Sequence, residues 1–287
     1  MWKSNILIDL KHMYLNDLIP IYGKDESLQM LNILIGHYFG LSRVEQTLQS
    51  AYKLSESEML KLHMAVKQLK KNKPLQYIIG ETTFIDYKIK VNEGVLIPRP
   101  ETEELVKLIL DNENLSDLNI LDIGTGSGCI AIALAANITN SHVYAMDISK
   151  KAIETAKQNA NINNVNIQFI EDDINKPSSK ISHNFDVIVS NPPYVRYLEK
   201  SQMKPNVLDY EPEIALFVDD HKPLKFYTAI MNFAKLFLND GGRLYFEINE
   251  ALADELRQSL LEYNYDKISI VKDINFKNRF VSAVKVE

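Results

Sequence analysis

From residue 119 onward, short apolar runs alternate with longer segments that carry apolar residues at helical spacing. A parallel strand needs a crossover helix to bring the chain back, so this alternation predicts a parallel α/β sheet. The predicted strands are 119–123, 143–148, 166–170, 185–190, 242–248, 267–273 and 279–286, and the predicted helices are 128–137, 149–162, 224–238 and 250–263. Because no helix separates the last two strands, we predict that they pair antiparallel, which gives a seven-stranded mixed sheet with an antiparallel last strand.

The region before residue 74 shows a different pattern, that of a small all-α N-terminal domain. Apolar residues recur at helical spacing between Leu28 and Phe39, and Gly40 is suited to end that helix. Ser55 and Glu58 have the spacing of a capping box and are expected to open the next helix. We expect these apolar stripes to form the core of a helical bundle.

Pro74 ends the helical region, and the chain changes to shorter alternating runs at Tyr77-Ile78-Ile79 and at 87–91. With glycines between them, these runs predict a β-hairpin that links two domains. The sequence is therefore predicted to divide into a helical domain at 1–73, a β-hairpin linker at 74–97 and an α/β domain at 98–287.

The composition excludes several classes of protein. Hydrophobic residues make up 46% of the chain and charged residues 24%, which is typical of a soluble globular protein. No apolar run approaches the length that spans a membrane, and the acidic residues near the N-terminus are unlike a signal or transit peptide. A single cysteine, Cys129, rules out an internal disulfide and a cysteine-rich metal cage, so a reducing cytoplasm is the expected compartment and no metal is expected.

The net charge of −6 is unevenly distributed. Through Pro74, ten Lys and Arg stand against seven Asp and Glu, a balance of +3, and the remainder holds 22 against 31, a balance of −9. The basic excess lies mainly in Lys67, Lys70, Lys71 and Lys73, which form either the solvated end of a helix or a surface that steers an acidic or RNA-associated partner. The strongly basic footprint of a direct nucleic-acid binder is missing.

A glycine-rich loop follows the predicted strand at 119–123 and leads into a helix. Glycines allow a tight turn and the close approach of a ligand, and the first amides of the helix point into the same space. The candidate cofactor-binding residues of this loop are Gly124, Thr125, Gly126, Ser127 and Gly128. The next strand ends at Asp147, where a carboxylate can accept both hydroxyls of a ribose. The pattern predicts a cofactor that contains a nucleoside, with a plain strand-to-helix turn as the alternative.

The spacing of the glycines narrows the identity of that cofactor. The dinucleotide fingerprint would place its third glycine at position 129, where this chain has Cys129. Asp122, two residues before the first glycine, would face a diphosphate poorly but could pair with a sulfonium-bearing amino acid. These features favour S-adenosylmethionine over a nicotinamide dinucleotide. After the third strand, Asp173 is the candidate acid for the adenine amino group and Ile174 the candidate cover of the ring, while Asp172 is equally suited to cap a helix.

The motif Asn191-Pro192-Pro193-Tyr194 follows the predicted buried strand at 185–190. Prolines offer no backbone donor, so strand pairing ends there and the flanking side chains are held at a strand tip, where open α/β sheets bind ligands. An amide oxygen, turn carbonyls and an aromatic ring suit a planar NH2 group. Asn191, Pro192 and Tyr194 are the candidate catalytic residues, all four residues are candidate substrate-binding residues, and Asn191 is also expected to adjoin the cofactor. Taken alone, the motif is equally consistent with a turn that closes a strand.

In this order, the glycine loop, the ribose acid and the Asn-Pro-Pro-Tyr motif resemble those of amino-group methyltransferases that use S-adenosylmethionine. Over residues 74–287 the chain is similar to one branch, the release-factor glutamine methyltransferases (PrmC/HemK family). The segments that carry this resemblance are Pro74–Gly80, Leu96–Glu103, Leu121–Ala131, Tyr210–Glu213 with Ala215-Leu216, and Asp273 with Asn278–Val281. The chain departs from the family at Asn249 and Ala251, where a glycine and a glutamine are frequent, and at Ile174, where some members carry an aromatic residue.

The resemblance implies a Rossmann-like S-adenosylmethionine-dependent methyltransferase domain and a defined reaction. Such enzymes methylate the side-chain nitrogen of the glutamine in the Gly-Gly-Gln motif of class 1 peptide-chain release factors. We expect the Asn191 oxygen and the Pro192 carbonyl each to accept one glutamine N–H, and Tyr194 to stack on the amide. The helical domain is expected to grip the release factor, and the protein to act as a monomer without a membrane or nucleic-acid partner.

Other interpretations stay open at this point. A DNA or RNA adenine-N6 methyltransferase would use the same motif on a flipped base, a nicotinamide-dependent oxidoreductase would use the glycine loop, and a helical adaptor would use neither. Arg99, Glu101 and Thr102 form either an ion pair and cap at a helix start, or a lid or release-factor contact. Glu211 is either a surface acid or a ligand of partner backbone.

Overall fold

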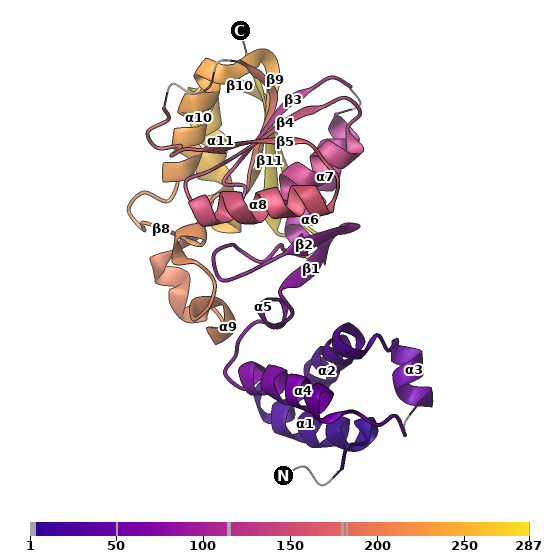
Figure 1. Cartoon of the computed structure of the whole chain (residues 1–287). Helices are drawn as coiled ribbons and strands as arrows, with labels where there is room; N and C mark the ends of the chain where they lie inside the picture. Colours follow the sequence, from indigo (N-terminus) through magenta and orange to yellow (C-terminus); the bar gives the residue numbers. More distant parts are fainter. Residues whose placement is uncertain (1–3, 50, 114–115, 179–180, 182, 287) are drawn as a thin grey trace. The chain divides into compact units, whose positions relative to one another are not determined.

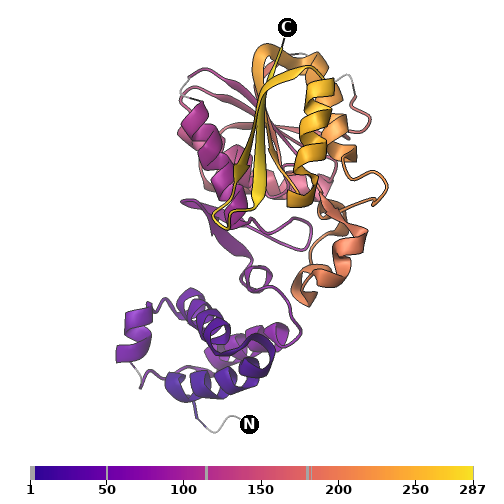
Figure 2. The same cartoon turned by 180° about the vertical axis from the view of Figure 1, so that it is seen from behind.

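The computed structural model describes residues 4–49, 51–113, 116–178, 181 and 183–286. Within these ranges the chain forms two compact units (Figures 1 and 2). The smaller unit holds the residues up to Gly80 together with Lys204–Tyr210, and the larger unit holds Glu81–Met203 and the residues from Glu211 onward. None of the described helices is both long and apolar enough to cross a lipid bilayer.

The smaller unit is helical, as predicted. Its helices are α1 (Leu7–Tyr22), α2 (Lys24–Phe39), α3 (Arg43–Leu48), α4 (Glu56–Leu69), α5 (Leu75–Ile79) and the short α9 (Pro205–Leu208). The apolar stripes of α2 and α4 meet in one core, which contains Leu31, Leu34 and Leu62. The expected capping box is present, because the Ser55 hydroxyl accepts from the Glu58 N–H at 3.3 Å and the Glu58 carboxylate accepts from the Ser55 N–H at 2.8 Å.

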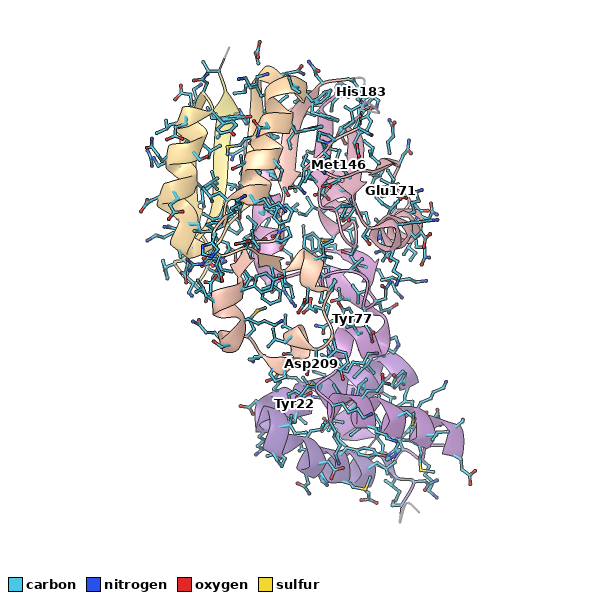
Figure 3. The ribbon with its side chains drawn as sticks, turned by 90° about the vertical axis from the view of Figure 1, so that its left-hand side faces the viewer. Tyr22, Tyr77, Met146, Glu171, His183 and Asp209 are labelled. Carbon is cyan, nitrogen blue, oxygen red and sulfur yellow. The ribbon has the colours of Figure 1, made fainter. Side chains whose placement is uncertain are left out.

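The segment Lys204–Tyr210 follows β6 and the Asn-Pro-Pro-Tyr motif in the sequence but packs with the helical unit. Figure 3 labels Asp209 within this segment. The Tyr210 hydroxyl donates to the Lys71 carbonyl at 2.8 Å, and the Lys73 ammonium lies 6.0 Å from the centre of the Tyr210 ring. An insertion in the α/β part of the sequence therefore contributes to the helical unit, which the sequence pattern did not indicate.

The predicted β-hairpin is present but starts later than expected. The run Tyr77-Ile78-Ile79, predicted to be a strand, is helical in α5, so that prediction is wrong. Pro74 precedes the helix and Gly80 ends it in a left-handed conformation with a φ of 85°, while Ile78 and Ile79 pack against the helical core. The hairpin itself pairs β1 (Glu81–Phe84) with β2 (Tyr87–Lys90) antiparallel, and it lies in the larger unit.

All seven predicted strands are present, and they form one sheet. In spatial order the strands are β10 (Tyr265–Lys272), β11 (Asn278–Lys285), β9 (Leu238–Glu247), β6 (Phe185–Ser190), β3 (Asn119–Ile123), β4 (His142–Asp147) and β5 (Ile167–Glu171). The last strand, β11, is antiparallel to both neighbours, and the pairs among the other strands are parallel. The mixed sheet with an antiparallel last strand is thus confirmed, with β9 beginning at Leu238 rather than at 242.

Helices cover both faces of the sheet (Figures 1 and 2). The helices α6 (Pro100–Asn112), α7 (Cys129–Asn137) and α8 (Lys150–Ile162) lie on one face, and α10 (Lys225–Phe237) and α11 (Ala253–Glu262) lie on the other. Successive side chains of a strand point to opposite faces. In β9, Leu244 and Phe246 join the core beneath α10 and α11, whereas Glu247 points toward α6 and bonds Thr102 of that helix. The alternation therefore places a carboxylate on the α6 side at the end of β9.

Candidate active site

The carboxyl ends of β3, β4, β5 and β6 border one cavity of about 390 Å³. At the centre of the sheet β3 and β6 are neighbours, with β4 beyond one and β9 beyond the other, which is the switch point where open α/β sheets bind ligands. The predicted site residues that line the cavity are Gly124, Gly126, Asp147, Asp173, Ile174, Asn191, Pro192 and Pro193. The fold therefore brings the candidate cofactor and substrate residues together at one edge of the sheet.

The other predicted loop residues, Thr125, Ser127 and Gly128, do not line the cavity, and all three are buried. The Thr125 hydroxyl donates to the Asp122 carboxylate at 2.6 Å. Gly128 has a φ of 82°, and a Cβ at this position would lie 2.9 Å from the Cβ of Ala156 in α8. The third glycine of the loop is thus required both by its left-handed backbone and by the close packing of α8 against it.

Asp147 at the end of β4 holds the glycine loop and faces the cavity. Its Oδ2 accepts from the Gly126 N–H at 2.9 Å, and its Oδ1 accepts from the Ser149 N–H at 2.8 Å. Burial raises the pKa of this carboxyl, and these N–H donors act in the opposite direction. Each carboxylate oxygen has more than one lone pair, so the group can still accept two further hydroxyl donors from the cavity.

Asp122 is the most strongly perturbed acid near the loop. Its side chain is fully buried, and burial raises its pKa to about 7, against the opposing hydrogen bond from the Thr125 hydroxyl. A positive charge in the adjoining cavity would favour the ionised form of this carboxyl.

The loop after β5 forms another part of the cavity wall. The Asp173 carboxylate accepts from the Asn175 backbone N–H at 2.9 Å and from its side-chain amide at 2.8 Å. The Asp172 carboxylate accepts from the Ser178 N–H and hydroxyl at 2.9 and 2.8 Å, so it stabilises this loop rather than a helix start. Ile174 lines the cavity and packs against the apolar core.

Phe226 lines the cavity but is not among the site residues predicted from the sequence. It lies in the first turn of α10, and it lines the same cavity as Ile174. Lys225 lines the cavity as well, and its ammonium lies 5.2 Å from the centre of the Phe226 ring. An aromatic surface is thus available in a pocket where the loop after β5 supplies only an isoleucine. The feature of the sequence that could have indicated this role is the position of an aromatic residue at the start of the helix predicted at 224–238.

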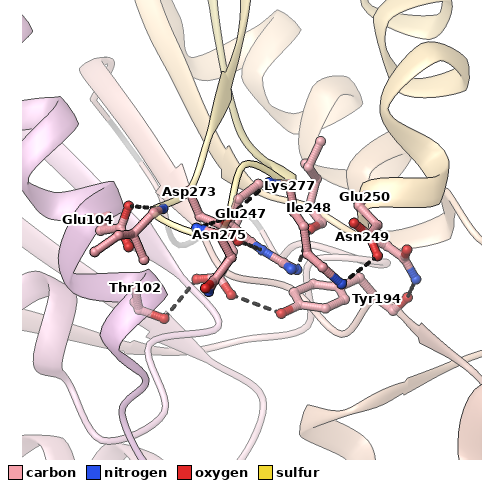
Figure 4. A network of polar contacts seen from close by, with 12 residues as sticks. Thr102, Glu104, Tyr194, Glu247, Ile248, Asn249, Glu250, Asp273, Asn275 and Lys277 are labelled. Carbon is pink, nitrogen blue, oxygen red and sulfur yellow. Dashed lines mark hydrogen bonds and ion pairs between the residues drawn. The ribbon is translucent and has the colours of Figure 1, made fainter. Parts of the chain in front are cut away.

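Thr102 of α6 and Glu247 of β9 hold the side chains of Asn191 and Tyr194 in place. Figure 4 shows the contacts of Glu247 with Thr102 and Tyr194. The Asn191 side-chain N–H donates to the Thr102 hydroxyl oxygen at 3.1 Å. The Thr102 hydroxyl donates to one oxygen of the Glu247 carboxylate at 2.7 Å, and the Tyr194 hydroxyl donates to the other at 2.9 Å. Glu247 is only 1% exposed. One buried carboxylate therefore connects the two polar side chains of the Asn-Pro-Pro-Tyr motif, and it is not among the site residues predicted from the sequence.

The protonation states of this network follow from its surroundings. Burial raises the pKa of Glu247, while the hydrogen bonds from Thr102 and Tyr194 and the positive charge of Arg279 act to lower it. Burial and the Glu247 charge raise the pKa of Tyr194, so the phenol remains a hydrogen-bond donor. Arg279 is fixed in turn by the Asp273 carboxylate, 3.1 Å from its Nε. The ring of Tyr194 packs against the core, whereas its three predecessors in the motif line the cavity.

Asn249, where the chain lacks the glycine frequent in the family that it resembles, supports the same turn. Its side-chain N–H donates to the Tyr194 carbonyl at 3.2 Å (Figure 4). It also donates to the Glu199 carboxylate at 3.0 Å. Its side-chain oxygen accepts from the Ala251 N–H at 3.0 Å. A glycine has no side chain to make these contacts. Asn249 therefore adds hydrogen bonds that stabilise the Asn-Pro-Pro-Tyr turn.

Arg99 and Glu211 form an ion pair. The Glu211 side chain is buried rather than a surface acid, and it also accepts from the Ile97 N–H at 3.1 Å. Arg99 occupies the N-cap position of α6 without a side-chain cap hydrogen bond. Thr102 does not cap the helix; it is buried and bonds Glu247. At Arg99 the predicted ion pair is thus present, with Glu211 as its partner, and the helix cap predicted with it is absent.

Models of known families match two parts of the chain. Residues 22–80 match the PrmC N-terminal domain, and residues 101–208 match the methyltransferase small domain. The chain is 43% identical to a release factor glutamine methyltransferase of Flavobacterium psychrophilum over 97% of this chain and 99% of that protein. It is 39% identical to a release factor glutamine methyltransferase of Bacteroides thetaiotaomicron over 92% of this chain and 94% of that protein.

Solved structures share the fold at lower sequence identity. A methyltransferase from Pyrococcus furiosus matches with a TM-score of 0.53 and 19% identity, over 81% of this chain and 100% of that chain. The 16S rRNA N2 G1207 methyltransferase of T. thermophilus, solved with AdoMet and guanosine, matches with a TM-score of 0.53 and 18% identity, over 71% of this chain and 49% of that chain. At these identities the likeness shows the α/β methyltransferase fold alone.

Proposed function

The chain belongs to the family of release factor glutamine methyltransferases, and from that premise we propose which atom it methylates and with which donor. The proposed reaction transfers a methyl group from S-adenosylmethionine to the side-chain amide nitrogen (N5) of the glutamine in the Gly-Gly-Gln motif of class 1 peptide-chain release factors. One observation carries the proposal: Asn191, Pro192 and Pro193 line the same cavity as the glycine loop and Asp147. A nucleoside-bearing methyl donor and a planar NH2 acceptor can therefore meet there.

The cavity residues fit S-adenosylmethionine, which supplies an electrophilic methyl group on a sulfonium. The Asp147 carboxylate retains acceptor capacity for the ribose hydroxyls, and Asp173 is the proposed acceptor for the adenine amino group. Ile174 and Phe226 offer apolar and aromatic surface to the adenine ring. The volume of about 390 Å³ lies within the range of roughly 300–1,000 Å³ that is usual for small-molecule pockets.

The proposed acceptor is an amide, whose nitrogen is a poor nucleophile because its lone pair is delocalised into the carbonyl. Orientation is therefore the main task of the protein. The Asn191 oxygen and the Pro192 carbonyl would each accept one glutamine N–H, which directs the nitrogen toward the methyl group for in-line transfer. Near-attack placement of this kind contributes roughly 7–11 kcal/mol at best. The partly exposed ring of Tyr194 would stack on the flat amide and exclude water.

The rest of the chain bears on the partner. The residues after Pro74, which include the α/β domain, carry a net charge of −9. This negative charge disfavours a nucleic-acid substrate. We assign release-factor recognition in part to the helical domain at 1–73 and methyl transfer to the domain at 98–287, with the hairpin linker at 74–97 between them in sequence. The proposed enzyme acts as a monomer in the cytoplasm.

Mass spectrometry on an unmethylated class 1 release factor tests the proposal. The factor is incubated with the full-length protein and S-adenosylmethionine, and the intact mass and the peptide containing the Gly-Gly-Gln motif are measured. We expect one added methyl group on the glutamine, and none on a matched factor that carries alanine in its place. No added methyl group, when cofactor binding is confirmed separately by titration, would refute the assigned substrate and leave the methyltransferase fold intact.

A further inference from the structure

Asn191, Thr102 and Glu247 form a series of hydrogen bonds, and the chemistry of these groups fixes which atom donates in each bond. A carboxylate only accepts hydrogen bonds, so the proton of the Thr102 hydroxyl points to Glu247, 2.7 Å away. The Thr102 oxygen is then left to accept, and it accepts from the Asn191 side-chain NH2 at 3.1 Å. Asn191 therefore turns its amide nitrogen toward α6, and its amide oxygen is the atom that it presents to the cavity that it lines.

We propose that Thr102 and Glu247 are positioning residues that set the substrate specificity of the site: by fixing the Asn191 amide, they make the site accept an NH2 group and reject a carboxylate. This inference deepens the proposed function and rests on it. The Asn191 oxygen and the Pro192 carbonyl are both acceptors. A glutamine amide brings two N–H donors to them, whereas a glutamate carboxylate brings only acceptors and a negative charge. Acceptors placed against acceptors leave buried polar groups unpaired, which disfavours binding strongly.

The hydrogen bonds from Asn191 to Thr102 and from Thr102 to Glu247 have this direction only if Glu247 is ionised. Two features of the site favour the ionised state. Its second oxygen accepts from the Tyr194 hydroxyl at 2.9 Å, so two hydroxyl donors stabilise the negative charge. The positive charge of Arg279 acts in the same direction and opposes the effect of burial. A neutral side chain in place of Glu247 would no longer fix the Thr102 proton, and the Asn191 amide would be free to turn over.

The same helix and strand hold a second buried carboxylate that provides a matched control. Glu113, at the C-cap of α6, accepts from the Tyr245 hydroxyl at 2.7 Å and from the Arg243 guanidinium at 2.6 Å. Like Glu247, it joins α6 to β9 and accepts from a tyrosine hydroxyl. It does not line the cavity, so its replacement tests the structural effect of losing such a carboxylate without touching Asn191.

The test uses full-length wild type, Thr102→Val, Thr102→Ser, Glu247→Gln and Glu113→Gln. The first measurement is methylation of the unmethylated glutamine factor, as kcat and KM, together with the dissociation constant of S-adenosylmethionine. The second is inhibition by two versions of the same factor that carry glutamate or alanine instead of the glutamine. Because all other contacts with the factor are shared, the ratio of the two inhibition constants isolates the discrimination against a carboxylate.

For wild type we expect the glutamate factor to inhibit about tenfold more weakly than the alanine factor, since one unpaired buried group is worth about that much. In Thr102→Val and Glu247→Gln this ratio should fall toward one, and kcat should fall about tenfold or more with an unchanged cofactor dissociation constant. Thr102→Ser keeps the hydroxyl, so its ratio of inhibition constants and its kcat should be close to those of wild type. Glu113→Gln should also have wild-type values of both.

Each contrary result has a distinct meaning. If Thr102→Val has the same ratio of inhibition constants as wild type, the inference is overturned. A loss of kcat in Glu113→Gln equal to that in Glu247→Gln also overturns it, because the effect of losing the carboxylate would then be structural. Failure of Thr102→Ser to restore activity also overturns it. A wild-type enzyme that does not methylate the glutamine factor overturns the proposed function itself, and this inference with it.

Discussion

Replacing Asp122 with asparagine should change how the stability of the cofactor-free protein depends on pH. The pKa of this buried carboxyl is about 7 in the folded protein, against an ordinary value of 3.8. Between these two values the folded state holds a proton that the unfolded state has released, so the wild-type protein loses stability as the pH rises, until the loss is complete above about pH 7. At about 1.36 kcal/mol per unit, the full effect is roughly 4 kcal/mol. Asparagine stays uncharged, and its oxygen can still accept the hydrogen bond from Thr125.

The assay is urea unfolding followed by far-ultraviolet circular dichroism, at pH 5 and pH 8 and without cofactor. Slightly more than a third of the effect is already present at pH 5, so Asp122→Asn should gain roughly 2–3 kcal/mol over wild type between pH 5 and pH 8. The control is Asp111→Asn, which changes an exposed aspartate at the end of α6. An Asp122→Asn advantage that is the same at both pH values would show that burial does not penalise the charge of this carboxyl, and it would refute the reasoning.

Four further predictions follow from single contacts. Asn191→Ala should lower turnover by about 100-fold or more and leave S-adenosylmethionine affinity nearly unchanged in a calorimetric titration; unchanged turnover would remove its orienting role. Asp147→Ala should weaken cofactor binding in the same titration, because the glycine loop loses an acceptor and the ribose loses its partner; an unaltered dissociation constant would exclude that role. Gly128→Ala should lower the free energy of unfolding by about 1–3 kcal/mol in urea, since the new Cβ meets Ala156 at 2.9 Å; wild-type stability would contradict this packing. Ser55→Ala should lower it by about 1 kcal/mol through loss of the capping box, and no change would show that the cap is energetically silent.

Much of the fold was predictable because its determinants are local. The strand at 119–123 and the strand at 185–190 have their predicted bounds, since each is an apolar run that ends at a glycine or at a proline pair. The failure at Tyr77-Ile78-Ile79 has a physical reason too. Three apolar residues in a row fit a strand or one turn of helix equally, and packing of the two isoleucines against the helical core decided for the helix. The placement of 204–210 in the helical unit depends on contacts such as Tyr210 with Lys71, which no local pattern encodes.

The sequence by itself determined the order of the strands along the chain, the glycine loop and the Asn-Pro-Pro-Tyr turn, because each is written in adjacent residues whose backbone preferences suffice. Only the tertiary structure decided which residues hold that turn in place, namely Thr102 and Glu247. Asn191 and Thr102 are 89 residues apart, and Thr102 and Glu247 are 145 apart. These side chains meet because β9 lies beside β6 and turns Glu247 toward α6, and strand order and the facing of a strand are properties of the assembled sheet.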